Sequence, residues 1–244
     1  MHVGPAVLLP ACAHEVRLLL EHPLPPEVAQ VGLPQGLERA VPRRQLQFRA
    51  GRYCAMKALT ALDHRFERCQ VGRAASGAPC WPDGTTGSIT HTHDFVSAAV
   101  ALTTDVEALG IDTEPVVSES QAQDLADLVG GPDETARARA AGMSENEAFT
   151  FVFSAKESIF KCLHPITGEY MDFHDVVIEN VDAHARTFAA RITRTVSRRF
   201  PRQTMLNGCF EVALPWVHTG ILLPSSRRDS HYHHPDSGGH RTLA

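Results

Sequence analysis

The sequence has no apolar run approaching the roughly 20 residues that a helix needs to cross a bilayer, so we predict no membrane-spanning segment. Residues 1–13 are mildly apolar, but they lack a basic leader and an apolar core long enough for a secretory signal peptide. Since both signals are absent, we expect no membrane partner and a cytoplasmic location.

The chain also lacks an excess of positive charge, because its 23 Lys and Arg residues are outnumbered by 28 Asp and Glu residues, a formal net charge of −5 at pH 7. This balance argues against a nucleic-acid partner. The six cysteines show no C-x-x-C spacing and no dense framework, so we expect reduced, mostly packed thiols. No internal repeat is visible.

What the chain does contain is enough apolar sequence for a core. Its 244 residues, 43% of them hydrophobic, suffice for one large domain or two small ones. We predict a helix starting near residue 43 and strands over 95–102, 108–113, 175–178, 187–192, 209–214 and 218–223. The acidic segment 118–139, with a short helix at 124–129, is either a mobile lid or an ordinary surface connection. Residues 225–244 have the composition of a disordered tail.

Two carboxylates lie on one face of a predicted strand. Residues 109–114 have an extended pattern, and the proline that follows ends it because proline has no N–H for the ladder. Side chains alternate along a strand, so Asp112 and Glu114 point the same way while Ile111 and Thr113 point into the opposite layer. Paired carboxylates repel each other without a positive partner, and an oxygen-only pair suits Mg²⁺ better than Zn²⁺.

A second set of charged residues lies on a helix that we predict over residues 144–163, beginning with a capping box. Glu157 and Lys161 lie at the edge of its apolar stripe, in the order that favours a helix ion pair, so an ordinary surface salt bridge is one interpretation. Lys156 falls inside the stripe, where an ammonium must reach water or meet a buried anion. A phosphate would serve as that anion.

These residues belong to four motifs. They read Arg52-Tyr53-Cys54-Ala55, Ser88-Ile89-Thr90-His91, Gly110-Ile111-Asp112-Thr113-Glu114 and Phe153-x-x-Lys156-Glu157-x-x-x-Lys161. In their order and composition the chain resembles the phosphopantetheinyl transferases of the larger, pseudo-dimeric type, over residues 44–165. The run from Pro79 to Gly84 also looks like actinobacterial and enterobactin-type members of that family.

The resemblance implies an α+β fold of two similar α/β halves in a pseudo-twofold arrangement, with residues 1–108 on the adenosine side of a coenzyme A cleft and residues 109–224 carrying the metal and the catalytic helix. It implies Mg²⁺-dependent transfer of the 4′-phosphopantetheine arm of coenzyme A to a serine of an apo acyl or peptidyl carrier protein, with release of adenosine 3′,5′-bisphosphate. Mn²⁺ is an alternative metal, and a monomer is expected.

The motif positions also imply a role for each residue. Asp112, Glu114 and Glu157 would hold the metal. Lys156 and Lys161 would contact the pyrophosphate, and Lys161 would help the leaving phosphate depart. Glu157, directly or through a water on the metal, would be the base for the serine hydroxyl. The residues implied for the adenosine end and its 3′-phosphate are Arg44, Arg52 and His91. Arg73 and Ser88 are implied to bind coenzyme A as well.

Three assignments have alternatives. Many members of the family carry a lysine in the loop where this chain has Arg73, which is the expected substitute. His93 lies on the same side of an extended segment as His91, but His91 completes the motif. The six arginines between residues 186 and 202 form either a docking surface for an acidic carrier protein or, as we favour, a charged strand edge that resists pairing.

Two other functions fit the same residues. A non-catalytic carrier-protein or nucleotide-binding module would keep the fold without turnover, although pure binding has little need of Glu157 and Lys161. A Mg²⁺-dependent phosphodiesterase would use water in place of the serine.

Overall fold

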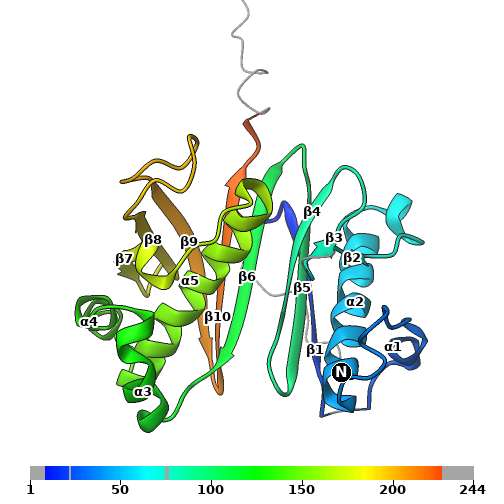
Figure 1. Ribbon diagram of the computed structural model, residues 1–244, viewed down its shortest axis with the longest axis horizontal. Helices are drawn as coiled ribbons and strands as arrows, with labels where there is room; N and C mark the ends of the chain where they lie inside the picture. The colour runs from blue at the N-terminus through cyan, green and yellow to red at the C-terminus, as the bar shows by residue number, and fades with distance from the viewer. Residues whose placement is uncertain (1–8, 22, 75–76, 227–244) are drawn as a thin grey trace, which may run out of the picture.

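The computed structural model describes residues 9–21, 23–74 and 77–226. In this part of the chain, two antiparallel sheets are each covered by a long helix (Figure 1). In chain order the elements are β1 (Ala13–Leu19), α1 (Pro26–Gln30), α2 (Pro42–Leu62), β2 (Gly72–Arg73), β3 (Pro79–Cys80), β4 (Thr85–His91), β5 (Phe95–Leu102), β6 (Val106–Pro115), α3 (Glu119–Val129), α4 (Pro132–Ala140), α5 (Glu145–Thr167), β7 (Val176–Asp182), β8 (Thr187–Ile192), β9 (Met205–Ala213) and β10 (Trp216–Pro224).

The first sheet has the strand order β1-β5-β4 and carries α2 on one face. Proline at the first position of α2 suits a helix start, where its missing N–H has no partner to lose. Ala55, Ala58 and Leu59 are fully buried against strand residues such as Val96 and Val100. The small alanines let α2 approach the sheet closely, as the sequence pattern predicts.

The second sheet has the order β6-β10-β9-β8-β7 and carries α5, with α3 and α4 beside that helix (Figure 1). The Ser144 hydroxyl accepts from Glu147 N at 3.4 Å, and the Glu147 carboxylate accepts from Ser144 N at 2.7 Å, so the predicted capping box is confirmed. Gly168, with φ of 69°, caps the other end. The helix therefore runs about one turn beyond residue 163.

Edge strands β4 and β6 join the two sheets, and hydroxyl side chains make the joint. Ser88 Oγ accepts from Ile111 N at 3.2 Å, and Thr90 Oγ1 accepts from Thr113 N at 3.1 Å. Residues 109 and 111 of β6 pack with Ala99 of the first sheet in a shared apolar cluster. The opposite face of β6 is turned to α5, because a Cβ on residue 110 would meet backbone of that helix. The predicted alternation on this strand is thereby confirmed.

The α+β class is confirmed, and two predictions need correction. Segment 118–139 is more than a connection with one short helix, because α4 packs on α5 with Ala138 fully buried. The predicted tail begins too early, since Ser225 is buried and its N–H donates to Asp105 O at 3.0 Å. The rest of the predicted tail, residues 227–244, lies outside the described residues. Among the described helices, none has the length and apolar character needed to cross a bilayer.

Candidate active site

Strand β6 and helix α5 bring the third and fourth motifs together. Lys161 Nζ donates to Asp112 Oδ1 at 2.5 Å, and Thr90 Oγ1 donates to the same oxygen at 3.2 Å. The Asp112 side chain is 2% exposed and that of Lys161 is 28% exposed. Burial acts to lower the pKa of Lys161, but the carboxylates of Asp112, Glu157 and Glu114 outweigh it and raise that pKa. Lys161 therefore stays an ammonium at any physiological pH.

Glu114 and Glu157 share this electrostatic neighbourhood. Burial, followed by the charge of Asp112 and of Glu157, raises the pKa of Glu114 to about 8, although Lys161 opposes the shift. Burial and the charge of Asp112 also raise the pKa of Glu157. Lys161 pairs with Asp112 rather than with Glu157, so the surface salt bridge within α5 is not among the ion pairs of the described residues.

Asp112, Glu114 and Glu157 fit a hard divalent cation in their chemistry. All the donor atoms are carboxylate oxygens, which Mg²⁺ prefers. Asp112 Oδ2 is buried without a hydrogen-bond partner, and the mutual repulsion that raises the pKa of Glu114 is what a cation would relieve. However, across residues 9–21, 23–74 and 77–226 no three His, Cys, Asp or Glu side chains form a ready-made metal cluster. Convergence of the three acids on one ion stays a prediction.

His91 and Arg44 lie on the other side of this neighbourhood, from β4 and α2. Arg44 Nη1 contacts His91 Nε2. Burial, together with the positive charges of Arg44 and Lys161, lowers the pKa of His91. His93, in contrast, has a 76% exposed side chain beside Asp94. Of the two candidate histidines, His91 is the one near Asp112 and Lys161.

Arg52 and Arg73 line a separate cavity of about 700 Å³ between α2 and the segments around residues 30–34 and 70–73. The buried Arg52 donates through Nη2 to Gly72 O at 2.9 Å and lies over the Phe48 ring, while its Nε has no partner. Burial and the nearby charge of Arg73 lower the pKa of Arg52 to about 10. Two guanidinium groups at one cavity would attract an anion.

Two predicted ligand residues have protein partners of their own. The Ser88 side chain is buried, and its hydroxyl accepts the hydrogen bond from Ile111 N described above. Lys156 is also buried and forms an ion pair with Glu134 of α4 at 2.9 Å. The sequence pattern requires Lys156 either to reach water or to meet a buried anion, and it does not identify Glu134. Thr90, which contacts Asp112, was likewise missed as an individual residue, although it is part of the Ser-x-Thr-His motif.

The arginine-rich stretch between residues 186 and 202 is largely neutralised. Arg191 pairs with Glu179 at 2.5 Å, Arg194 pairs with Asp175 at 2.7 Å, and Arg199 contacts Glu107. These acids come from other elements, so a count along the sequence misses them. The stretch presents less net positive charge than its composition predicts.

Comparison with known proteins settles the family. Residues 33–101 match the family described as "4'-phosphopantetheinyl transferase N-terminal domain", and residues 108–212 match the "4'-phosphopantetheinyl transferase superfamily". A protein named 4'-phosphopantetheinyl transferase Svp, from Streptomyces mobaraensis, is 37% identical over 198 residues, covering 77% of this chain and 75% of that protein. The chain belongs to the 4′-phosphopantetheinyl transferase superfamily.

Other relatives place this transferase in the larger type within the superfamily. 4'-phosphopantetheinyl transferase PptT from Mycobacterium tuberculosis is 30% identical over 207 residues, 82% of this chain and 86% of that protein. Enterobactin synthase component D from Salmonella typhi is 34% identical over 125 residues, 51% of this chain and 50% of that protein. The activity of the family is transfer of a phosphopantetheine group from coenzyme A to carrier proteins.

Proposed function

We propose that this transferase moves the 4′-phosphopantetheine arm of coenzyme A to a serine of an apo acyl or peptidyl carrier protein in a Mg²⁺-dependent reaction that releases adenosine 3′,5′-bisphosphate. The observation that carries the proposal is the shared neighbourhood of Asp112, Glu114, Glu157 and Lys161. Three acids and one permanently charged lysine are the groups that phosphoryl transfer requires, because it is accelerated mainly by positioning and charge stabilisation.

The transfer step forms one P–O bond and breaks another. The serine oxygen attacks the phosphorus that carries pantetheine, and the bond from this phosphorus to the bridging pyrophosphate oxygen breaks. Glu157 takes the serine proton as the general base, directly or through a water. The electron pair of the broken bond leaves with adenosine 3′,5′-bisphosphate.

Lys161 is placed to stabilise the departing phosphate. Its ammonium stays charged, and its side chain is the part-exposed member of the pair with Asp112. Mg²⁺, held by Asp112, Glu114 and Glu157, would supply further charge to neutralise the pyrophosphate oxygens. Lys161, from its place beside Asp112, would contact the pyrophosphate oxygens.

The adenosine end of coenzyme A is assigned to α2. Arg44, beside His91, and Arg52, at the large cavity with Arg73, lie eight residues apart on this helix, which corresponds to about 12 Å of rise. A ligand as long as coenzyme A can reach from one arginine to the other. The 3′-phosphate would then lie near the second group, where a planar guanidinium suits its oxygens.

We further infer a monomer acting in the cytoplasm, where coenzyme A is plentiful. The cytoplasmic assignment agrees with the six cysteines, which show no dense disulfide spacing.

Incubation with coenzyme A, Mg²⁺ and an apo acyl carrier protein tests the proposal by mass spectrometry of the carrier. We expect a mass gain on its serine, abolished by a metal chelator and restored by added Mg²⁺. Nucleotide release without mass gain would indicate a phosphodiesterase, and neither change with a panel of carriers would indicate a binding module. Full activity in the presence of chelator would contradict the metal requirement alone.

A further inference from the structure

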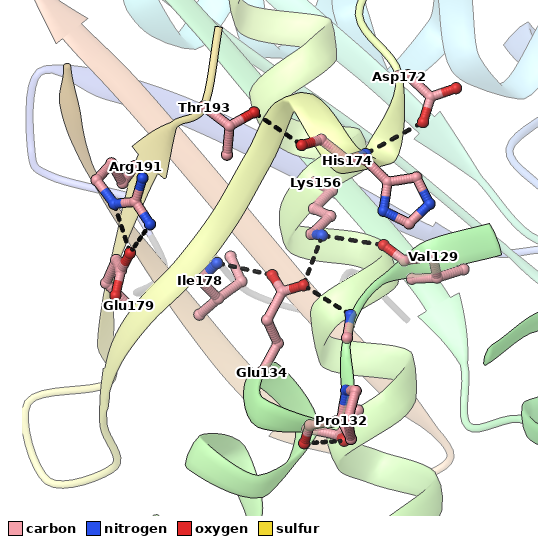
Figure 2. A network of polar contacts seen from close by, with 12 residues as sticks. Val129, Pro132, Glu134, Lys156, Asp172, His174, Ile178, Glu179, Arg191 and Thr193 are labelled. Carbon is pink, nitrogen blue, oxygen red and sulfur yellow. Dashed lines mark hydrogen bonds and ion pairs between the residues drawn. The ribbon is translucent and has the colours of Figure 1, made fainter. Parts of the chain in front are cut away.

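The ammonium of Lys156 is enclosed by protein acceptors (Figure 2). Nζ donates to Glu134 Oε2 at 2.9 Å and to Val129 O at 2.9 Å, and the side chains of Lys156 and Glu134 are 2% and 4% exposed. An ammonium has three protons to donate, so two are already bound. Because Val129 is the last residue of α3, this lysine connects α5 with the end of that helix.

The Glu134 carboxylate is engaged as completely as the lysine. Its Oε2 also accepts from Gly131 N at 3.2 Å, and its Oε1 accepts from Ile178 N at 2.7 Å. Gly131 precedes α4 and Ile178 lies on β7, so one carboxylate connects the start of α4 with the sheet and with α5 (Figure 2). Loss of either charge would leave the other buried without a partner, which is strongly destabilising.

The turn between α3 and α4 is fitted to this ion pair. A Cβ on Gly130 would lie 2.5 Å from Glu134 Oε2 and 3.1 Å from Lys156 Nζ. Any larger residue there would push the carboxylate away from the ammonium. The close approach therefore depends on glycine, and the pair and the turn form one packed unit.

This unit lies next to the catalytic residues. Lys156 directly precedes Glu157 on α5, and the segment that the ion pair fastens begins directly after β6, the strand that carries Glu114. A second contact, from Val117 N to Thr150 Oγ1 at 3.1 Å, holds the start of the same segment on α5. The two contacts fix α5 relative to the end of β6.

We propose that Glu134 is a positioning residue of the transfer reaction, which acts through Lys156 to keep Glu157 aligned with the acids of β6. Lys156 then contributes by holding α5 in place, and Lys161 is the lysine that contacts the pyrophosphate. This inference rests on the proposed function, because alignment matters only if Glu157 acts on the substrate.

Steady-state kinetics of the full chain test the role, with a natural control in the second ion pair between α4 and the start of α5. Arg139 and Glu145 are 2.8 Å apart and more than half exposed. At a temperature where all variants are folded, we expect Glu134→Gln to lower kcat about 100-fold, with KM for coenzyme A changed by less than about twofold. Glu145→Gln should leave both constants unchanged, because exposed pairs contribute little.

A double variant keeps the proposal testable if Glu134→Gln fails to fold. Glu134→Gln/Lys156→Met removes both buried charges, and we expect it to fold with a kcat about tenfold below that of the wild-type protein, since no unpaired charge remains. A rise in KM for coenzyme A in every Lys156→Met variant, with kcat retained, would overturn the proposal in favour of a phosphate contact. A kcat of Glu134→Gln equal to that of the wild-type protein would also overturn the proposal. If the wild-type protein modifies no carrier, the proposed function itself fails, whatever the variants do.

Discussion

At the scale of single residues, the three acids of the site differ in their surroundings. Asp112 has a lysine and a threonine hydroxyl on one oxygen and no partner on the other. Burial and the neighbouring acids raise the pKa of Glu114 to about 8. Glu157 lies on a different element, and its pKa is raised as well. Similar side chains thus lie in different surroundings.

Replacement of Glu157 separates chemistry from binding. We expect Glu157→Gln to reduce transfer about 100-fold or more, because the amide cannot accept the serine proton. Coenzyme A binding, measured by calorimetry, should remain detectable, since the amide keeps the shape of the side chain. The matched control is Glu145→Gln, an exposed acid on the same helix. Near-normal transfer by Glu157→Gln would remove this residue from the role of base.

Replacement of Lys161 distinguishes a catalytic lysine from a structural one. We expect Lys161→Ala to lower kcat about 100-fold through lost stabilisation of the departing charge. The melting temperature should fall by much less than for Glu134→Gln, because Lys161 is part-exposed and Thr90 still donates to Asp112, whereas Lys156 and Glu134 are enclosed. A large loss of melting temperature with modest loss of turnover would instead identify an ordinary salt bridge.

At the scale of elements, the site depends on how closely β6 approaches α5. A Cβ on Gly110 would lie 2.0 Å from Ser158 O and 2.6 Å from Cys162 N, both backbone atoms of the helix. Backbone cannot move aside as a flexible side chain can. The helix that carries Glu157 and Lys161 is therefore held at a distance from Asp112 that only glycine permits.

Gly110→Ala should accordingly destabilise the fold by about 3 kcal/mol, the upper end of the usual cost of overpacking. Transfer should also fall in the fraction that still folds, because α5 is displaced from the strand. Thermal unfolding and kinetics together measure the two effects. Gly32→Ala is the control, since a Cβ there would have nothing within 4 Å and should leave stability nearly unchanged. Equal stability of the two variants would contradict this account of the contact.

Local pattern predicts the elements better than it predicts their partners. The strand at 95–102 follows from a short apolar run, and the strand at 187–192 and the alternation along β6 follow from period-two patterns. The capping box follows from two residues at fixed spacing. Helix α4 is not predicted, because its sequence has little apolar character. It packs through Glu134 and Ala138. The partner of Lys156 is likewise a tertiary contact, and residues that meet only in the fold leave no local signal.

At the scale of the whole molecule, the two sheets meet through polar as well as apolar groups. Arg17 of β1 is buried and donates through Nη1 to Glu211 Oε2 of β9, in the other sheet, at 3.5 Å. His218 of β10 lies in the same interface, with its Nδ1 3.0 Å from Thr113 Oγ1 and its ring 5.1 Å from that of Phe95. Burial, and then the charge of Arg17, lower the pKa of His218 to about 3. The interface therefore requires a neutral histidine.

Stability should fall on acidification because of this histidine. The unfolded chain binds a proton at His218 near pH 6.5, whereas the folded protein does so only near pH 3. The contribution is fully present above the unfolded pKa and declines as pH falls between these values, by about 2 kcal/mol at pH 5. Urea unfolding at pH 7.5 and pH 5 measures the slope. His218→Asn should flatten it and the exposed His184→Asn should not, and an unchanged slope in His218→Asn would refute the assignment.

The chain carries only three lysines, Lys57, Lys156 and Lys161, against 20 arginines. Lys57 is exposed at the large cavity, Lys161 is partly covered, and Lys156 is enclosed. Chemical acylation of amines should consequently give a graded footprint that mass spectrometry can resolve site by site. Because the chain has so few primary amines, each lysine can report on its own surroundings. Protection of Lys57 and Lys161 by coenzyme A would trace the path of the bound nucleotide without any engineered label.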